Sequence, residues 1–230
     1  SSGLVGKNLM FHPYAHIYGY VDEPLDGNRG PPLCVWSQEF YETDKARDFV
    51  RGYIFQFSRG TGAIIEAITS TLSGRLPVGR AHHGVYRKLM NRRVGMVAAI
   101  EDLPEEHNRV TLDPVQKDSD GIPAPKIDYT IGDNSRKMLA HAIGNARTIL
   151  EAAGATGIAS EAPILNGGWH LLGTARMGND PERSVVNGWG RSHDVKNLFI
   201  VDGSIWVTSG GVNPTSTIQA LALYIADQIK

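Results

Sequence analysis

Two stretches, GGWHLLGTARMG (Gly167–Gly178) and NLFIVDGSIWVTSGGVNPTST (Asn197–Thr217), decide the fold of this chain. In the second stretch an apolar run ends in a polar turn, Asp202-Gly203-Ser204. A glycine pair (Gly210-Gly211) follows, and a helix is predicted to begin at Asn213. A strand, a polar turn, a glycine pair and a helix N-terminus in succession are typical of a ligand site at the end of a sheet.

The bulk composition indicates a globular chain with a sizeable core. Its 230 residues are 41% hydrophobic, enough for one large or two smaller domains. With 23 basic and 24 acidic residues the net charge is −1, so no global field favours nucleic acid or an anionic membrane surface. No apolar run approaches the roughly 20 residues of a membrane span. Neither nucleic acid nor a membrane span is therefore expected.

The N-terminus and the cysteine content bear on the kind of chain and its location. The chain opens on SSGLVGKNLM, without an initiator Met, a targeting segment or a recognisable tag. A start of this kind predicts a fragment or a processed chain rather than a complete enzyme. Cys34 is the single cysteine, which excludes an intrachain disulfide and fits a reducing compartment, so a cytoplasmic location is expected.

Short runs of β-branched and aromatic residues predict a mainly antiparallel sheet between about residues 14 and 130. From Tyr14 to Val21, tyrosine and histidine side chains alternate with Ala15 and Ile17, so the two sets are expected on opposite faces. Further strands are predicted at Leu33–Trp36, Gly52–Phe57, Val94–Ile100, Arg109–Leu112, Lys126–Tyr129 and Asn197–Val201. Together with two helices, these strands indicate the α+β class.

The two helices are predicted from apolar residues at helical spacing. The first runs from about Asn134 to Ala153, with Asp133 or Asn134 as its cap. The second runs from Pro214 to about Ile229, with Asn213 at the N-cap. Both apolar stripes are expected to face a core: Leu139, Ala142, Ile143, Ala146, Ile149, Leu150 and Ala153 in the first helix, and Ile218, Leu221, Ala222, Ile225 and Ile229 in the second.

Three other features indicate no chemistry by themselves. Gly60-Thr61-Gly62 precedes a helical run but lacks the third glycine and the acidic residue of a dinucleotide fingerprint, so these are turn glycines. Gly74–Gly84 is predicted as a loop, and the adjacent His82 and His83 within it make a poor metal pair because they point in different directions. No metal site is predicted. His12, taken alone, is expected to be an ordinary loop or surface residue.

His170, Asn213 and Asp202 are the candidate chemical groups. His170 lies among glycines, where backbone approaches a ligand closely, and a neutral imidazole accepts a proton near neutral pH. Each residue also has an ordinary alternative: a structural loop histidine, a helix cap and a turn-forming acid. Ser204 together with His170 and Asp202 suggests a hydrolase triad, but VDGSIW is not the Gly-x-Ser-x-Gly elbow of such enzymes.

Taken together, three motifs in order resemble the C-terminal part of the glucose–methanol–choline (GMC) flavin oxidoreductases. They are His-x-x-Gly-Thr-x-x-Met-Gly from His170, Asn-Leu-x-x-x-Asp-x-Ser from Asn197 and Asn-Pro-Thr-x-Thr from Asn213. Upstream, SSGLVGKNLMFHP is similar to the family's Gly-x-x-x-Gly-x-Asn-Leu-x-x-His segment. EDLPEEHNRVTLDP and the helix ending in Ala-Ala-Gly-Ala resemble the family's sugar and gluconate dehydrogenase branch.

The resemblance implies an FAD cofactor in a discontinuous α/β domain and an antiparallel sheet on the substrate side. Residues 1–13 would be a remnant of the FAD-binding domain, residues 14–165 the substrate domain, and residues 166–230 the C-terminal segment of the FAD-binding domain. His170 would take the hydroxyl proton of an alcohol or sugar while a hydride passes to flavin N5, and Asn213 would hydrogen-bond the substrate oxygen. The family's cofactor contacts would fall on Asn8, Asp202, Gly203, Gly211, Val212, Asn213, Pro214 and Thr215.

The family's N-terminal Gly-x-Gly-x-x-Gly unit is absent from this sequence. The chain alone is therefore expected to bind FAD weakly or not at all, and to need a missing N-terminal portion as its partner. Two alternatives stay open: a hydroxynitrile-lyase-like flavoprotein on the same scaffold, and an inactive fragment or interaction subunit. The residues do not identify the alcohol or sugar, nor the electron-acceptor partner, which could be oxygen, a quinone or a cytochrome.

Overall fold

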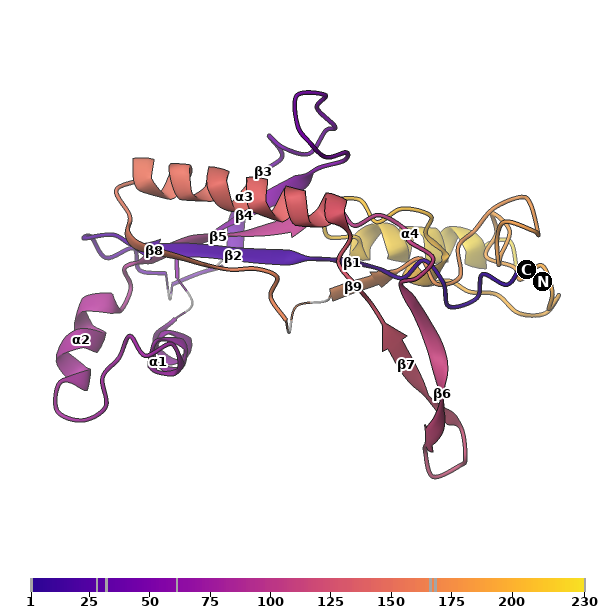
Figure 1. Ribbon diagram of the computed structural model, residues 1–230, viewed down its shortest axis with the longest axis horizontal. Coiled ribbons are helices and arrows are strands. Elements are labelled where there is room, and N and C mark those ends of the chain that lie inside the picture. The colour runs from indigo at the N-terminus through magenta and orange to yellow at the C-terminus, as the bar shows by residue number, and fades with distance from the viewer. Residues whose placement is uncertain are drawn as a thin grey trace.

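A five-stranded antiparallel sheet in the order β3-β4-β5-β2-β8 forms the centre of the chain (Figure 1). Two smaller sheets, β1-β9 and β6-β7, have two strands each. The computed structural model describes all residues except Ser1, Asn28, Pro32, Thr61, Asn166, Gly168 and Lys230, so the predicted turn at Gly60–Gly62 lies partly outside the described residues. The described chain has the predicted α+β class.

The elements follow one another along the chain with these bounds. The strands are β1 (Met10–His12), β2 (Tyr14–Tyr20), β3 (Leu33–Ser37), β4 (Tyr53–Ser58), β5 (Arg93–Ile100), β6 (Arg109–Lys117), β7 (Pro123–Asp128), β8 (Thr156–Glu161) and β9 (Trp169–Leu172). The helices are α1 (Ala63–Leu72), α2 (His82–Leu89), α3 (Asp133–Ala152) and α4 (Thr215–Ala226), with a short 3₁₀ helix, η1 (Gly203–Ile205).

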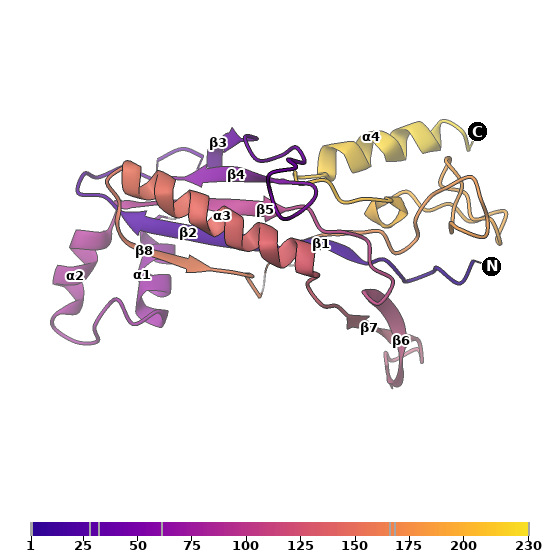
Figure 2. The ribbon, with the colours of Figure 1, turned by 45° about the horizontal axis from the view of Figure 1, so that its top comes forward.

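Helix α3 covers one face of the central sheet (Figure 2). Ile17 of β2 and Met96 of β5 pack in one apolar cluster with Ala142 and Leu150 of α3, and all four side chains are buried. Removal of this apolar surface from water is the main force that holds helix and sheet together. The core of the chain therefore lies between α3 and the sheet.

The opposite face of the sheet carries a different set of side chains. Tyr14 of β2 belongs to a separate buried cluster with Ile54 and Ala99, and Val212 of the C-terminal region packs against it. The alternation predicted for β2 is confirmed, since Ala15 lies in the core against α3 and Tyr14 does not. The face away from α3 thus meets the loop that precedes α4.

Helix α3 begins without a side-chain cap. Its N-cap residue is Gly132, so the cap predicted at Asp133 or Asn134 is wrong. The Asn134 side chain instead accepts from the amide of Val50 at 2.9 Å and donates to the carbonyl of Val50 at 3.1 Å. This long-range pair ties the helix to the segment before β4, and no local capping pattern reveals it. Of the predicted apolar stripe, Ile149 and Ala153 are exposed.

Helix α4 begins at Thr215, after Pro214 as its N-cap residue. The prediction that Asn213 caps this helix is wrong, because no side chain forms a cap hydrogen bond there. Ile225 is buried as predicted, but Ile229 lies beyond the end of the helix and is 49% exposed.

The segment predicted as a loop at Gly74–Gly84 ends instead in helix α2, which starts at His82. Glycine at position 84 weakens the helical pattern that sequence reasoning relies on. A tertiary contact supplies the missing stability, because the hydroxyl of Tyr86 donates to the carbonyl of Ala63 in α1 at 2.7 Å.

The strand predicted at Asn197–Val201 is also wrong. In the described chain this run forms one isolated bridge, between Arg191 and Phe199. A strand needs a neighbouring strand for its backbone hydrogen bonds. Leu198 and Val201 are 46% and 41% exposed. The run is apolar, but no strand of the described chain packs over these side chains.

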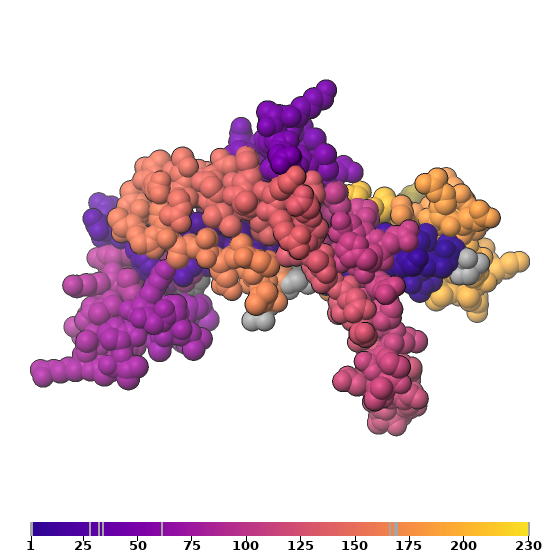
Figure 3. Space-filling model, in the orientation of Figure 1, coloured from indigo at the N-terminus to yellow at the C-terminus, as the bar shows by residue number. Residues whose placement is uncertain are grey.

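Helices α1 and α2 and the β6-β7 hairpin project from the side of the sheet opposite α3, as two separate lobes in Figure 3. Among the described residues, no helix has the length and apolar character needed to cross a bilayer.

Candidate active site

His170 lies in an irregular part of the small β1-β9 sheet. Met10 pairs with Leu172 and His12 pairs with Trp169, and the register shifts between these two pairs. His170 has a φ of 63°, in the left-handed region that residues other than glycine rarely adopt. Irregular pairing of this kind redirects a side chain, and strained backbone of this kind is concentrated at functional sites.

The imidazole of His170 contacts a second imidazole. Nδ1 of His170 lies 2.8 Å from Nδ1 of His12 and 3.2 Å from the hydroxyl of Tyr14. On its other side, Nε2 of His12 is hydrogen-bonded to the carbonyl of Gly210. His12 is fully buried, so the expectation that it is a loop or surface residue is wrong. Its position in β1, opposite β9, is a tertiary contact that the sequence around it does not show.

These partners determine which ring nitrogens carry protons. The carbonyl of Gly210 can only accept, so Nε2 of His12 donates to it. Burial, and to a lesser degree the neighbouring His170, lowers the pKa of His12 to about 4. At neutral pH His12 therefore has one proton, on Nε2, and its Nδ1 is an acceptor.

His170 must then donate through its own Nδ1, which leaves Nε2 with a free lone pair. Burial also lowers the pKa of His170, so the ring is neutral at neutral pH. The Tyr14 oxygen also accepts a hydrogen bond from this Nδ1–H group. Burial raises the pKa of Tyr14 to about 12, so its hydroxyl stays protonated. The Nε2 atom of His170 is thus the basic position of the site.

Asp102, just after the end of β5, anchors the two segments that carry His12 and Gly210. The buried carboxylate of Asp102 accepts the amide of Phe11, beside His12, at 3.4 Å. The hydroxyl of Ser209, beside Gly210, donates to the carbonyl of Asp102 at 2.9 Å. Because one residue anchors both segments, the imidazole of His12 and the carbonyl of Gly210 come together.

Asn213 supplies hydrogen-bond donors, whereas Nε2 of His170 is an acceptor. Its Oδ1 accepts a hydrogen bond from Nε2 of Gln56, in β4, at 2.9 Å. Gln56 is only 6% exposed, whereas Asn213 is exposed. Because Gln56 occupies the Asn213 oxygen, the amide NH₂ with its two donors points away from Gln56. Asn213 therefore presents hydrogen-bond donors.

The residues that hold the two groups, Tyr14 and Gln56, lie on the same face of the central sheet, the face away from α3. Tyr14, which contacts His170, shares an apolar cluster with Val212, the residue before Asn213. Gly210, three positions before Asn213, bonds to His12. The structure therefore brings His170 and Asn213 into one region, while the catalytic roles assigned to them stay predictions.

Asn8 and the start of α4 have unused hydrogen-bond donors. Asn8 is 3% exposed with a φ of 63°, and its Nδ2 has no hydrogen-bond partner in the described part of the chain. An orphaned buried donor of this kind fits a bound group that completes it. The first turn of α4, where Thr215 is exposed and no side chain caps the backbone, offers further N–H donors. These residues fit an electron-rich cofactor such as a flavin.

The two glycines predicted to contact the cofactor have a packing role in the structure. A Cβ at Gly203 would lie 2.8 Å from the carbonyl oxygen of Leu171, and one at Gly211 would lie 2.9 Å from that of Gly52. Both glycines therefore allow the C-terminal loop to approach the sheets. Val212 packs against the sheet and Pro214 is buried. Their contacts with a cofactor stay predictions.

Asp202 and Ser204 contact each other rather than His170. The exposed carboxylate of Asp202 accepts the amide of Ser204 at 2.8 Å and begins η1. Among the described residues, His170 has its ring hydrogen bonds with His12 and Tyr14. This arrangement gives no support to a hydrolase triad.

Sequence reasoning missed His12, Tyr14 and Gln56 as site residues. His12 is the last residue of the family's Gly-x-x-x-Gly-x-Asn-Leu-x-x-His segment, and this motif is the sequence feature that could have identified it. Tyr14 and Gln56 are placed only by strand register and by contacts with distant residues.

A family model described as GMC oxidoreductase matches residues 104–222, slightly more than half of the chain. The chain belongs to the GMC oxidoreductase family. It is 42% identical over its whole length to the 2-methyl-1,2-propanediol dehydrogenase of Mycolicibacterium austroafricanum. It is 32% identical over its whole length to the fructose dehydrogenase large subunit of Gluconobacter japonicus. The predicted likeness of this GMC chain to alcohol and sugar dehydrogenases is confirmed.

The chain spans 42% and 41% of the length of these two relatives. A formate oxidase of Aspergillus oryzae RIB40, studied for modification of its FAD, has a similar fold, with a TM-score of 0.63 at 16% identity. The match covers all of this chain and 48% of the formate oxidase. The chain thus has the fold of the C-terminal part of a GMC oxidoreductase.

Proposed function

We propose that this chain supplies the proton acceptor and the substrate-positioning donor for FAD-dependent oxidation of a primary or secondary alcohol or a sugar. The observation that carries the proposal is the hydrogen-bond chain from Gly210 through His12 to His170. This chain leaves Nε2 of His170 basic, and Asn213 offers the complementary donor. A base and a donor directed at one oxygen are what activation of an alcohol requires.

The residues would act on the substrate hydroxyl in a single arrangement. Nε2 of His170 accepts the hydroxyl proton, while the NH₂ group of Asn213 donates a hydrogen bond to the same oxygen. The negative charge that develops there makes the neighbouring C–H a better hydride donor. FAD, when bound, supplies the hydride acceptor. A positioned base of this kind contributes on the order of 10²–10⁴ in rate.

Three observations support FAD as the cofactor. The chain belongs to a family that includes a solved relative with FAD. The buried Nδ2 of Asn8 is unsatisfied in the described chain, and the first turn of α4 has no side-chain cap. The dipole of α4 favours negative charge at that end. The contacts predicted at Asp202, Gly203, Gly211, Val212, Pro214 and Thr215 belong to this proposal.

We also propose the division into residues 1–13, 14–165 and 166–230, because β1 pairs with β9 across the whole substrate segment. We propose that a complete FAD site also requires an N-terminal portion, in line with the greater length of the two relatives. The fructose dehydrogenase relative is a large subunit, which supports a partner subunit, and we propose that an electron acceptor is among the partners. A cytoplasmic location stays a prediction.

The test is His170→Ala in the chain combined with such an N-terminal portion. Turnover should fall by at least about a hundredfold, because the general base is lost, while the flavin absorbance is retained. His83→Ala, an exposed histidine in α2, is the matched control and should leave turnover unchanged. Near-normal turnover of His170→Ala would remove His170 from the mechanism.

Anaerobic bleaching of the flavin by an alcohol separates this proposal from its alternatives. An oxidoreductase bleaches, whereas a hydroxynitrile lyase on the same scaffold does not. Failure to bind FAD even with the N-terminal portion present would favour an inactive fragment or interaction subunit.

A further inference from the structure

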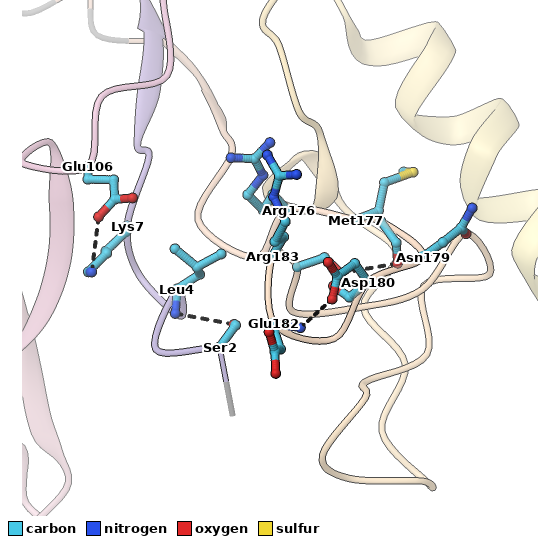
Figure 4. Close-up of a pocket in the computed structure, with 12 residues that line it drawn as sticks. Ser2, Leu4, Lys7, Glu106, Arg176, Met177, Asn179, Asp180, Glu182 and Arg183 are labelled. Atoms are coloured by element: carbon cyan, nitrogen blue, oxygen red, sulfur yellow. Dashed lines mark hydrogen bonds and ion pairs between the residues drawn. The ribbon is translucent and has the colours of Figure 1, made fainter.

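A polar cavity of about 580 Å³ lies between the N-terminal segment and the loop that follows β9 (Figure 4). Both segments belong to the proposed FAD-binding domain. The lining carries as many acids as cations, namely Lys7, Arg176 and Arg183 with Glu106, Asp180 and Glu182. The cavity is therefore part of the proposed cofactor domain and has no surplus charge that would select a separate ligand.

The face of the central sheet away from α3 continues beyond the residues that hold the proposed base and donor. Tyr14 contacts His170, and Gln56 contacts Asn213. His16 lies two positions after Tyr14 in β2, so its side chain is on the same face, about 7 Å further along the strand. This imidazole takes no part in the hydrogen-bond chain that fixes the tautomer of His170.

The strand register places His16 level with Gln56. Both residues pair with Val97 of β5, His16 from β2 and Gln56 from β4. The three residues therefore form one row across the sheet, with about 10 Å between the two outer strands. Val97 is partly exposed and packs against the apolar cluster of this face, which includes Tyr14. A polar side chain thus stands on each side of an apolar floor, and the one on the Gln56 side contacts Asn213.

The ring nitrogens of His16 are unused and accessible. Within the described part of the chain, His16 forms no hydrogen bond or ion pair, and neither ring nitrogen is among the buried atoms that lack a partner. Burial, and to a lesser degree Arg93, lowers the pKa of His16 to about 4, so the ring is neutral at pH 7. A neutral imidazole has one donor and one acceptor nitrogen, which are the two functions that a hydroxyl group also offers.

A buried cluster on the same face holds this imidazole in place. The ring of His16 lies 5.1 Å from the ring of Tyr18, and the guanidinium of Arg93 lies 3.8 Å over the Tyr18 ring. Arg93 pairs with Glu66 of α1 at 3.5 Å, and both of these residues are buried. The position of His16 is therefore fixed by packing, which a residue that discriminates between ligands requires.

We propose that His16 determines specificity in the proposed oxidation by hydrogen-bonding a second hydroxyl of the substrate, which favours diols and sugars over simple alcohols. The reacting oxygen lies between His170 and Asn213, the carbon skeleton covers Val97, and a further hydroxyl reaches His16. This inference rests on the proposed function, because that function defines the position of the reacting oxygen. His16 itself takes no part in the transfer of the proton or the hydride.

The test compares substrates that differ by one hydroxyl, in the chain combined with an N-terminal portion and FAD. The pairs are ethylene glycol with ethanol, and D-glucose with 3-deoxy-D-glucose. In the unmodified protein kcat/KM should be about tenfold higher for the member with the extra hydroxyl, as for one additional hydrogen bond. His16→Phe should bring this ratio close to one, mainly through a higher KM for that member, because the contact is the same before and during the reaction. His16→Gln should keep part of the preference, because its amide also donates and accepts.

His83→Phe is the matched control, since His83 is an exposed histidine of α2, and it should keep the ratio of the unmodified protein. Tyr18→Phe keeps the ring beside His16 and removes a neighbouring hydroxyl, so loss of the preference in this variant would assign the contact to Tyr18 instead. Thermal unfolding of every variant checks that the fold is intact. An unchanged ratio in His16→Phe, with turnover retained, would overturn this inference and leave the proposed function standing. If none of the four compounds bleaches the flavin, the proposed function and this inference both fail.

Discussion

The imidazole and the amide of the candidate site are held in different ways. His170 is half-buried and is fixed by a strained backbone, a strand partner and the fully buried His12. Asn213 is exposed, and within the described part of the chain its side chain has one hydrogen bond, from Gln56. The difference indicates that the protonation state of the base is fixed by the fold, whereas the donor is oriented by a single contact. Removal of a supporting residue should therefore lower turnover more when the residue supports His170 than when it supports Asn213.

The largest effect after loss of His170 itself is expected from Asn213→Ala. This change removes the donor that stabilises charge on the substrate oxygen, so turnover should fall by about tenfold to a hundredfold. Steady-state kinetics at pH 7 measures this effect in the FAD-loaded protein. A loss larger than that of His170→Ala would reverse the proposed order of the two groups.

His12→Phe tests the support of the imidazole. Without an acceptor for its Nδ1 proton, His170 populates the wrong tautomer, and turnover should fall about tenfold, as for the loss of one hydrogen bond of about 1.4 kcal/mol. His12→Gln should restore much of the rate, because its amide both donates to Gly210 and accepts from His170. If Phe and Gln lower the rate equally, His12 has only a packing role.

Gln56→Leu is the matched change on the amide side. It removes the hydrogen bond to Asn213 and frees the amide to rotate, but the exposed Asn213 keeps its donors. The rate should fall only a few fold, in line with a single neutral hydrogen bond, and KM should rise more than kcat falls. A larger loss than that of His12→Phe would show that the donor, not the base, depends most on its support.

A separate effect concerns stability and pH. Burial lowers the pKa of both His12 and His16 to about 4, with smaller contributions from His170 and Arg93 respectively. Between pH 6.5 and about 4 the unfolded chain binds more protons than the folded chain, so stability is full above pH 6.5 and falls with decreasing pH through this window.

Urea unfolding at pH 7 and pH 5 measures this dependence. His12→Gln should flatten it relative to the unmodified chain, since one of the two histidines no longer titrates. An unchanged slope would mean that the pKa of His12 is the same in the folded and the unfolded chain.

The sequence predicts four strands of the central sheet, β2, β3, β4 and β5, because apolar and alternating runs are local patterns, but it does not predict β8. The predicted strands Tyr14–Val21 and Val94–Ile100 agree with β2 and β5 to within one residue at each end. Asn197–Val201 is also an apolar run but has only one bridge in the described chain, since a strand depends on its neighbour as well as on its own residues. Local apolar runs therefore identify where a strand can form, and pairing decides whether it does.

The candidate site was predictable only in part. His170 and Asn213 stand beside glycines in motifs that span few residues, so the sequence reveals them. His12 and Gln56 act across 158 and 157 positions of chain, and no local spacing encodes such contacts. The predicted cap at Asn213 failed for the same reason, because its side chain binds a strand instead of its own helix.

The tautomer of His170 tests the central claim most directly. Long-range proton–nitrogen NMR spectra of the chain with ¹⁵N-labelled histidine, at pH 7, report which ring nitrogen carries the proton. The hydrogen-bond chain from Gly210 predicts a protonated Nδ1 and an unprotonated Nε2 for His170, with the reverse for His12. Protonation of His170 on Nε2 would contradict the account, because that nitrogen could then accept no proton from an alcohol.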